Sequence, residues 1–253
     1  MHSHKKAHHI IVAGYSRSGT TMFYHMLRST VKGYEFMDEE VPAERLVGRD
    51  RKNRITKRPL DLFNLDQIHK NNRYRKRLSL IILIRDIRSI LTSFHSAVPD
   101  DYFIGYDYQY FINRATGENS YQNPGVLPIH EALVQAMNNP NFEKKIVLKY
   151  EDILDSPDQQ QAFLGGELGF TYSDNFENFH EHAIPQHLTR QLNTVRGIDA
   201  SRIESWKKPE HAQRIRSQFT RCPALFDILI QYGYEKDRSW FEPYRREKPP
   251  VTR

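Results

Sequence analysis

Hydroxyl-bearing and cationic residues gather in one short stretch, Tyr15-Ser16-Arg17-Ser18, which Gly14 and Gly19 bracket and Thr20-Thr21 follow. A glycine-bounded turn that leads into a helix aims several backbone N–H groups and the positive end of the helix dipole at one point. Such a turn binds a phosphate-like anion, and the hydroxyls and the Arg17 guanidinium add donors. An ordinary Gly/Ser turn before a helix has a similar composition, so the other motifs must decide.

The lysine of an ATP-binding loop is missing from this stretch. The spacing from Gly14 to Gly19 is that of the pattern G-x-x-x-x-G-K-[ST], but Thr20 stands at the lysine position. That lysine places a point charge on the terminal phosphates of ATP, and threonine cannot replace it. An ATP-dependent small-molecule kinase is the alternative interpretation of this loop, and Thr20 at the lysine position argues against it.

Three neighbouring carboxylates, Asp38-Glu39-Glu40, follow a short strand predicted over 34–37 and precede a helix that starts near Val41-Pro42-Ala43. Carboxylates are favoured in the first turn of a helix. They also suit a general base at the carboxyl end of a parallel strand, where open α/β sheets place their sites. Both interpretations stay open on the residues alone.

A second possible phosphate site follows the clearest buried strand, Leu78 to Ile84. Its near-continuous apolar run is typical of a central parallel strand covered on both faces. Arg85 leaves the end of this strand, and Ser93 is expected two turns into the next helix, so both could hold one phosphate. The competing interpretation makes Asp86 a magnesium-binding residue of an ATPase.

The predicted elements alternate between strands and helices, which indicates an α/β fold. Further strands are predicted over 10–13, 54–57 and 145–149, and further helices over 20–27, 61–69, 129–137 and 157–165. Residues 98–128 are predicted to form a long connection dense in aromatic residues. These aromatics either bind an acceptor or pack on one another.

Several motifs resemble those of the sulfotransferases that use 3′-phosphoadenosine 5′-phosphosulfate (PAPS). Arg17-Ser18-Gly19-Thr20-Thr21 resembles their 5′-phosphosulfate loop, [K/R]-S-G-T-T. Arg85 and Ser93 match their second nucleotide motif, Arg-Asp-Pro-Arg with a serine eight residues after the first arginine, although Ile87 replaces the proline. Residues 150–165 and 201–208 resemble two further blocks of that family.

The resemblance implies a set of nucleotide-binding residues: Ser16, Arg17, Ser18, Gly19, Thr20, Thr21, Arg85, Ser93, Arg196 and Arg202. Within this set Arg85 and Ser93 would hold the 3′-phosphate, joined by either Arg196 or Arg202.

It also implies catalytic residues. The base would be Glu40 or, after it, Glu39, with Asp38 still competing. Arg17 would take up charge in the transition state. Lys57, which precedes Arg58-Pro59, resembles a family lysine that approaches the sulfuryl group or the bridging oxygen; a solvated lysine at a strand end is the alternative.

The implied fold is a three-layer α/β/α domain with a central parallel sheet, of the P-loop nucleotide-kinase type. We expect one domain over residues 1–253, with a flexible His-rich N-terminus over 1–8 and a basic tail over 244–253.

The implied reaction transfers a sulfuryl group from PAPS to an acceptor hydroxyl or amine, leaves adenosine 3′,5′-bisphosphate (PAP) and requires no metal. The acceptor stays open among carbohydrates, phenols, peptidyl tyrosine and lipid hydroxyls, and so does the oligomeric state. A nucleotide-binding module without turnover is the non-enzymatic alternative.

Charge and hydropathy restrict the partners. The net charge of +6 and the pI of about 9.3 suit an anionic ligand. Nucleic acid is not expected, because the densest basic cluster, 49–58 with 73–77, is interrupted by Asp50 and aliphatic residues.

No apolar run approaches the roughly 20 residues that span a bilayer. The N-terminus lacks an apolar signal core, so we expect a cytoplasmic protein. The single cysteine, Cys222, excludes an intrachain disulfide.

Overall fold

The computed structural model describes residues 6–93, 108–113, 118–183, 197–200 and 203–246. The chain divides into two compact units, the first formed by Met1–Arg85 with Ala132–Ala200 and the second by Asp86–Glu131 with Ser201–Arg253. The expectation of a single domain over 1–253 stays a prediction.

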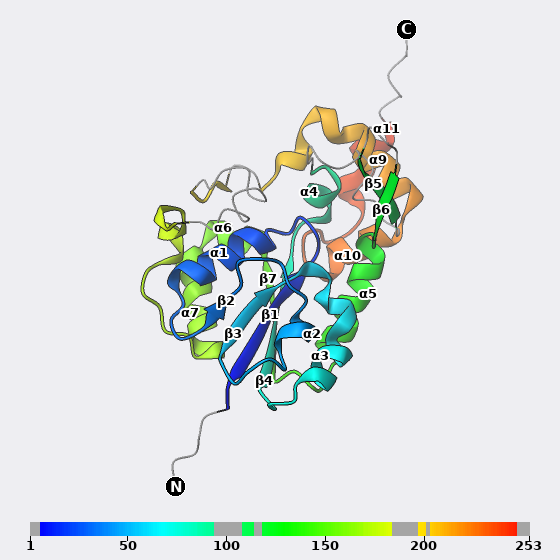
Figure 1. The fold of residues 1–253 in the computed structure, drawn as a ribbon. Coiled ribbons are helices and arrows are strands. Elements are labelled where there is room, and N and C mark those ends of the chain that lie inside the picture. Colours follow the sequence, from blue (N-terminus) through cyan, green and yellow to red (C-terminus); the bar gives the residue numbers. More distant parts are fainter. Residues whose placement is uncertain (1–5, 94–107, 114–117, 184–196, 201–202, 247–253) are drawn as a thin grey trace. The chain divides into compact units, whose positions relative to one another are not determined.

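The first unit is built on a five-stranded parallel sheet with the order β2-β3-β1-β4-β7 (Figure 1). Its strands are β1 (His8–Gly14), β2 (Glu35–Phe36), β3 (Arg54–Lys57), β4 (Arg77–Ile84) and β7 (Lys144–Lys149). Val12 of β1 pairs with Lys57 of β3 on one side and Ile81 of β4 on the other. The predicted parallel α/β sheet is confirmed.

Helices cover both faces of this sheet, so the predicted three layers are present (Figure 1). The helices α1 (Thr20–Thr30), α6 (Tyr150–Asp155) and α7 (Pro157–Leu168) lie on one face. The other face carries α2 (Ala43–Leu46), the 3-10 helix η1 (Pro59–Asn64) and α3 (Leu65–Asn71). Helix α5 (Val126–Met137) crosses the division between the units, and η2 (Phe176–Glu181) follows α7.

Alternation along β1 supplies both faces of the sheet with core residues. Ile10 and Val12 join the cluster that contains Phe23 and Leu27 of α1. Ile11, which is also fully buried, points to the opposite face because successive side chains of a strand alternate.

The N-terminal segment expected to be flexible is too long by at least one residue, because His8 begins β1 and is 3 % exposed. Its backbone N–H donates to Oδ1 of Asn53 at 2.9 Å. Its ring nitrogens lie 2.9 Å from the Tyr34 hydroxyl and 2.8 Å from Oγ of Ser79. These buried partners explain how a polar residue extends the apolar strand.

The second unit is mostly helical. It contains α4 (Ile87–Leu91), η4 (Ser205–Lys207), η5 (Pro209–His211), α9 (Ala212–Arg221), α10 (Ala224–Gln231), η6 (Ser239–Phe241) and α11 (Glu242–Arg246). The tail expected from residue 244 is therefore helical to Arg246, and residues 247–253 lie outside the described part. No helix among the described residues is long and apolar enough to cross a membrane.

The connection expected over 98–128 contains a hairpin of β5 (Tyr108–Asn113) and β6 (Glu118–Asn123). The strands are antiparallel, with Tyr110 opposite Tyr121. Aromatic residues favour strands, and this preference outweighs the loop-like composition around them. The start of the connection, 98–107, lies outside the described residues.

Candidate functional site

The loop after β1 makes a tight turn with two left-handed residues. Arg17 has φ 66° and Gly19 has φ 83°. The Ser18 backbone N–H and hydroxyl both donate to the Tyr15 carbonyl, at 3.3 and 2.7 Å. The Ser18 hydroxyl proton thus closes the turn, and the expected role of Ser18 in nucleotide binding stays a prediction. Helix α1 starts at Thr20 and has no side-chain cap, so its first N–H groups can serve an external anion.

Glycine is required at both ends of this loop by close packing. A Cβ at Gly14 would lie 2.1 Å from the backbone oxygen of Leu83 in β4. A Cβ at Gly19 would lie 2.4 Å from Cδ2 of Tyr150, the first residue of α6. The loop is thus held against β4 on one side and α6 on the other.

Arg85, at the end of β4, joins the loop to α6. Its Nη1 donates to the Arg17 carbonyl at 3.0 Å, and its guanidinium lies 4.4 Å from the centre of the Tyr150 ring. Its Nε is buried and has no hydrogen-bond partner among the described residues. The structure therefore brings Arg85 to the loop and leaves one of its donors unsatisfied among the described residues, whereas its expected role in binding the 3′-phosphate stays a prediction.

Tyr150 was predicted to be mainly architectural, and its contacts make it part of this site. Its ring lies close to Gly19 and carries the Arg85 guanidinium over its face. Its position at the carboxyl end of β7 follows from the sheet order, since the carboxyl ends of parallel strands share one edge.

A second group lies at the carboxyl ends of β2 and β3. Nζ of Lys57 is 2.6 Å from Oε2 of Glu40. The Lys57 side chain is 5 % exposed, whereas that of Glu40 is 34 % exposed. The backbone N–H of Arg58 donates to the Val12 carbonyl at 3.1 Å, which fixes the end of β3 beside β1 just before the loop.

The three candidate carboxylates have different surroundings. Asp38 forms an ion pair with Arg28 of α1 at 2.6 Å, while Glu40 is paired with Lys57. Glu39 is exposed. The segment is held by Tyr24 of α1, whose hydroxyl accepts the Met37 backbone N–H at 2.7 Å. Glu40 is thus the one that β3 orients.

Asp61 is a buried carboxylate that the sequence reasoning missed. It is 1 % exposed, accepts the Ala43 backbone N–H at 3.1 Å, and lies 3.4 Å from Nη1 of Arg58. Burial raises the pKa of Asp61 to about 6, and the nearby Glu40 adds to that effect, whereas the Ala43 N–H and Arg58 lower it. Asp61 therefore ties the start of α2, three residues after Glu40, to the turn after β3.

Ser93 does not lie inside a helix as expected, because α4 ends at Leu91. The Thr92 side chain and backbone N–H both donate to the Arg88 carbonyl, at 2.7 and 3.1 Å, and the Ser93 N–H turns to the Ile90 carbonyl. The Ser93 N–H thus bonds three residues back instead of four, which tightens the last turn where the helix ends. Ser93 belongs to the second unit and Arg85 to the first, so their joint role stays a prediction.

Arg88, the second arginine of the same motif, has a structural environment in the second unit. It is 3 % exposed, with Asp86 at 2.7 Å and Glu235 as carboxylate partners. Its guanidinium lies 3.8 Å from the Trp206 ring and 4.6 Å from the Trp240 ring. Arg88 thus anchors the helices of that unit. Arg196 and Arg202 lie outside the described residues.

No model of a known protein family matches this sequence, and no curated protein matches it. Solved structures do resemble it. Mouse sulfotransferase SULT7A1 complexed with PAP has a TM-score of 0.53 at 16 % identity, over 88 % of this chain and 86 % of that one.

Two further sulfotransferase domains give similar values. The sulfotransferase domain of the Synechococcus PCC 7002 olefin synthase has a TM-score of 0.52 at 13 % identity, over 85 % of this chain and 96 % of that one. The sulfotransferase domain of the curacin biosynthetic pathway has a TM-score of 0.51 at 14 % identity, over 85 % and 98 %. At these identities the likeness shows a shared fold.

Proposed function

We propose that this chain, which has the fold of the sulfotransferases, is a PAPS-dependent sulfotransferase. The observation that carries the proposal is the position of Arg85, which joins the loop over 14–19 to Tyr150 and keeps a buried Nε without a partner among the described residues. A buried guanidinium N–H that lacks an acceptor is costly, and a bound phosphate would satisfy it.

The residues around the loop suit a nucleotide with two anionic ends. The backbone N–H groups at the start of α1, with the hydroxyls of Thr20 and Thr21, would bind the 5′-phosphosulfate. Arg85 would bind the 3′-phosphate, with Ser93 and either Arg196 or Arg202 as further ligands. PAPS, when bound, supplies the sulfuryl group, and PAP is the product.

The residues at the ends of β2 and β3 suit the acceptor. Glu40 would accept the proton of the acceptor hydroxyl or amine, and Lys57 orients the Glu40 carboxylate from its buried position. Arg17 and Lys57 would stabilise the negative charge that grows on oxygen as the bond to sulfur breaks. Catalysis then depends mainly on positioning and electrostatics, as in phosphoryl transfer. The acceptor is a carbohydrate, peptide or small-molecule hydroxyl.

Calorimetric titration of the full chain tests the proposal. We expect PAP to bind without magnesium and adenosine 5′-phosphate, which lacks the 3′-phosphate, to bind at least about 10-fold more weakly, since one hydrogen-bonded charge contact is worth about 1.5–3 kcal/mol. Preference for ATP with magnesium would overturn the proposal in favour of a kinase. Equal binding of the two adenosine nucleotides would remove the assignment of Arg85 to the 3′-phosphate.

A further inference from the structure

The excess positive charge of the chain lies in one segment. Residues 44–77 contain twelve Lys and Arg against four Asp and Glu, a net charge of +8 in a chain whose whole net charge is +6. The segment belongs to the first unit. Lys57 and Arg58 lie at the candidate site, and Arg54 and Lys76 are buried, so most of the other cations face solvent.

Asp50, which interrupts the basic cluster in the sequence, is turned inward in the structure. Its carboxylate lies 2.7 Å from Nη2 of Arg54 and 3.4 Å from Nζ of Lys76. Burial opposes its ionisation, but the hydrogen bonds from Arg54 and the Lys52 backbone, with the charges of Arg54 and Lys76, outweigh burial and lower the pKa of Asp50. Asp50 thus neutralises buried cations and leaves the exposed arginines uncompensated.

Two turns bring these exposed arginines together. The guanidinium carbon of Arg51 lies 5.6 Å and that of Arg73 lies 5.1 Å from the centre of the same ring, Tyr74, which is 37 % exposed. Arg49 and Arg75 are also exposed and lie on the same two turns. We refer to Arg49, Arg51, Arg73, Tyr74 and Arg75 as the basic face.

The turn that carries three of the five residues of the basic face, Arg73, Tyr74 and Arg75, is fixed by its own hydrogen bonds. Oδ1 of Asn72 accepts the Lys76 backbone N–H at 2.9 Å, and Nδ2 of Asn72 donates to the Lys76 carbonyl at 2.8 Å. The Arg75 N–H donates to the Asn72 carbonyl at 2.9 Å, and Arg75 adopts a left-handed φ of 49°. The like charges are therefore held together by the fold without a ligand.

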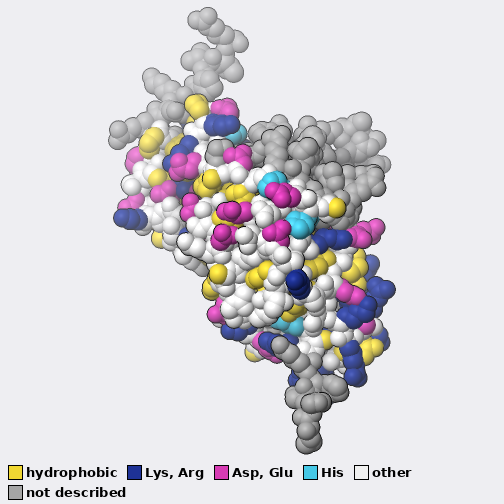
Figure 2. All heavy atoms as spheres, turned by 90° about the vertical axis from the view of Figure 1, so that its left-hand side faces the viewer, with side chains coloured by type: hydrophobic (Ala, Val, Ile, Leu, Met, Phe, Trp, Pro, Cys, Tyr) yellow, Lys and Arg dark blue, Asp and Glu magenta, His cyan; other side chains and the backbone are white. Residues whose placement is uncertain are grey.

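The basic face lies at the amino ends of β3 and β4, whereas the loop over 14–19 lies at the carboxyl ends of the parallel strands (Figure 1). Figure 2 shows Lys and Arg side chains gathered along the lower right edge of the view. This surface is distinct from the candidate site within the first unit.

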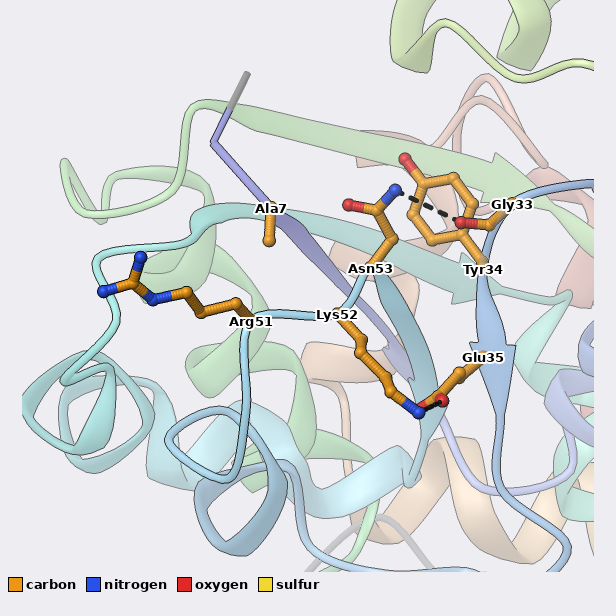
Figure 3. A pocket seen from close by; sticks show the side chains of 7 residues that line it. All are labelled: Ala7, Gly33, Tyr34, Glu35, Arg51, Lys52 and Asn53. Carbon is orange, nitrogen blue, oxygen red and sulfur yellow. Dashed lines mark hydrogen bonds and ion pairs between the residues drawn. The ribbon is translucent and has the colours of Figure 1, made fainter. Parts of the chain in front are cut away.

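A cavity lies next to the basic face, but Arg51 is the one residue of that face that lines it. It has a volume of about 540 Å³ and is lined by Ala7, Gly33, Tyr34, Glu35, Arg51, Lys52 and Asn53 (Figure 3). Arg51 and Lys52 point away from one another, and Lys52 forms an ion pair with Glu35. The other arginines of the basic face are exposed on the two turns.

We propose that the basic face docks on an anionic membrane surface. Basic residues near such a surface contribute attraction that adds up over the patch. Two guanidinium groups over a partly exposed tyrosine ring suit the boundary between head groups and acyl chains, where amphipathic side chains place their apolar parts. A membrane surface is broad and contacts exposed turns without a groove, and the basic face lies on two such turns. This attachment places the candidate site at the opposite edge of the sheet.

Sedimentation of the full chain with lipid vesicles tests this proposal. We expect binding to phosphatidylcholine vesicles that contain about 30 % phosphatidylserine, no binding to phosphatidylcholine alone, and loss of binding as the salt rises from about 0.1 M to about 1 M. The triple variant R51Q/R73Q/R75Q should bind about 100-fold more weakly. Its thermal midpoint and PAP affinity check that it is folded.

A matched control removes three exposed cations elsewhere, in the variant K32Q/R221Q/K236Q. It should keep its binding within about three-fold, because its residues lie outside the basic face. Equal loss in both variants would overturn the proposal in favour of a general charge effect. Binding of a single-stranded oligonucleotide through the basic face, without vesicle binding, would overturn it in favour of nucleic acid.

Discussion

Nζ of Lys57 lies 2.6 Å from Oε2 of Glu40, and this pair joins the end of β3 to the segment that follows β2. The lysine side chain is almost completely buried, whereas about a third of the Glu40 side chain is exposed. An anchored cation thus orients a carboxylate that a molecule from solvent can reach. Neither neighbouring acid, Asp38 or Glu39, has this combination.

The first prediction concerns the general base. Glu40→Gln keeps the size of the side chain but removes its proton affinity, so turnover should fall by roughly 10²–10⁴. PAP affinity, measured by calorimetry, should stay within about two-fold because Glu40 is not placed on the nucleotide. Glu39→Gln is the matched control and should retain most of the turnover. The opposite pattern would assign the base to Glu39.

The second prediction separates the two members of the ion pair. If Lys57 acts largely by orienting Glu40, Lys57→Gln should lower turnover in the wild type but have a much smaller effect in the Glu40→Gln background. Rates of the four proteins in a double-mutant cycle measure this coupling. If the rate of the double variant falls by the product of the two single-variant factors, Lys57 acts independently of Glu40, for example directly on the transferring group.

The third prediction concerns Arg85. Arg85→Ala should weaken PAP binding by about 10- to 150-fold, the equivalent of about 1.5–3 kcal/mol for a lost charged hydrogen bond. Arg77→Ala is the control, since Arg77 begins the same strand and pairs with Glu143 at 2.7 Å far from the loop. Unchanged PAP affinity in the Arg85 variant would remove this residue from the nucleotide site.

The fourth prediction concerns pH and Asp61. A carboxyl whose pKa is raised on folding favours the folded state when protonated, so this contribution is present below its ordinary value of 3.8 and is lost as pH rises toward about 6. The amide that replaces the carboxyl in Asp61→Asn does not titrate. The free energy of unfolding of the wild type, relative to that of Asp61→Asn, should therefore fall between these pH values, by at most about 1.4 kcal/mol per pH unit.

Urea unfolding at several pH values measures this difference. Asp66→Asn is the control, because Asp66 is exposed and contacts only Asn139 among the hydrogen bonds described for it. A relative stability of the Asp61 variant that does not change between pH 4 and pH 6, the range set by the raised pKa, would contradict the effect of burial.

The sheet could be predicted because its signal is local. Residues 78–84 fall within β4, since a buried strand carries its apolar residues consecutively. Residues 54–57 coincide with β3, although only Ile55 among them is apolar. The early end of helix α4 and the hairpin β5–β6 could not be predicted. At the end of α4 the Ser93 N–H donates to the Ile90 carbonyl, three residues back, and composition alone does not reveal this change.

The candidate site was predictable only in part. The sequence singled out Arg17 and Arg85 as motif residues but not their contact, in which Nη1 of Arg85 donates to the Arg17 carbonyl. The choice among Asp38, Glu39 and Glu40 depends on partners from α1 and β3, which sequence spacing does not supply.

Tyr24, Asp61 and Tyr150 were missed as site residues for the same reason, because their contacts are long-range. The one available signal was an aspartate between Leu60 and Leu62, where an isolated acid in an apolar context indicates burial with a partner.

The two glycines of the loop differ in what opposes them, and this difference has a genetic consequence. An alanine at position 14 would collide with the backbone of Leu83, which no replacement of a side chain can remove. An alanine at position 19 would collide with the ring of Tyr150, which a smaller residue can remove. In a search for second-site suppressors, Gly19→Ala should partly recover through changes at Tyr150, whereas Gly14→Ala should yield only true revertants.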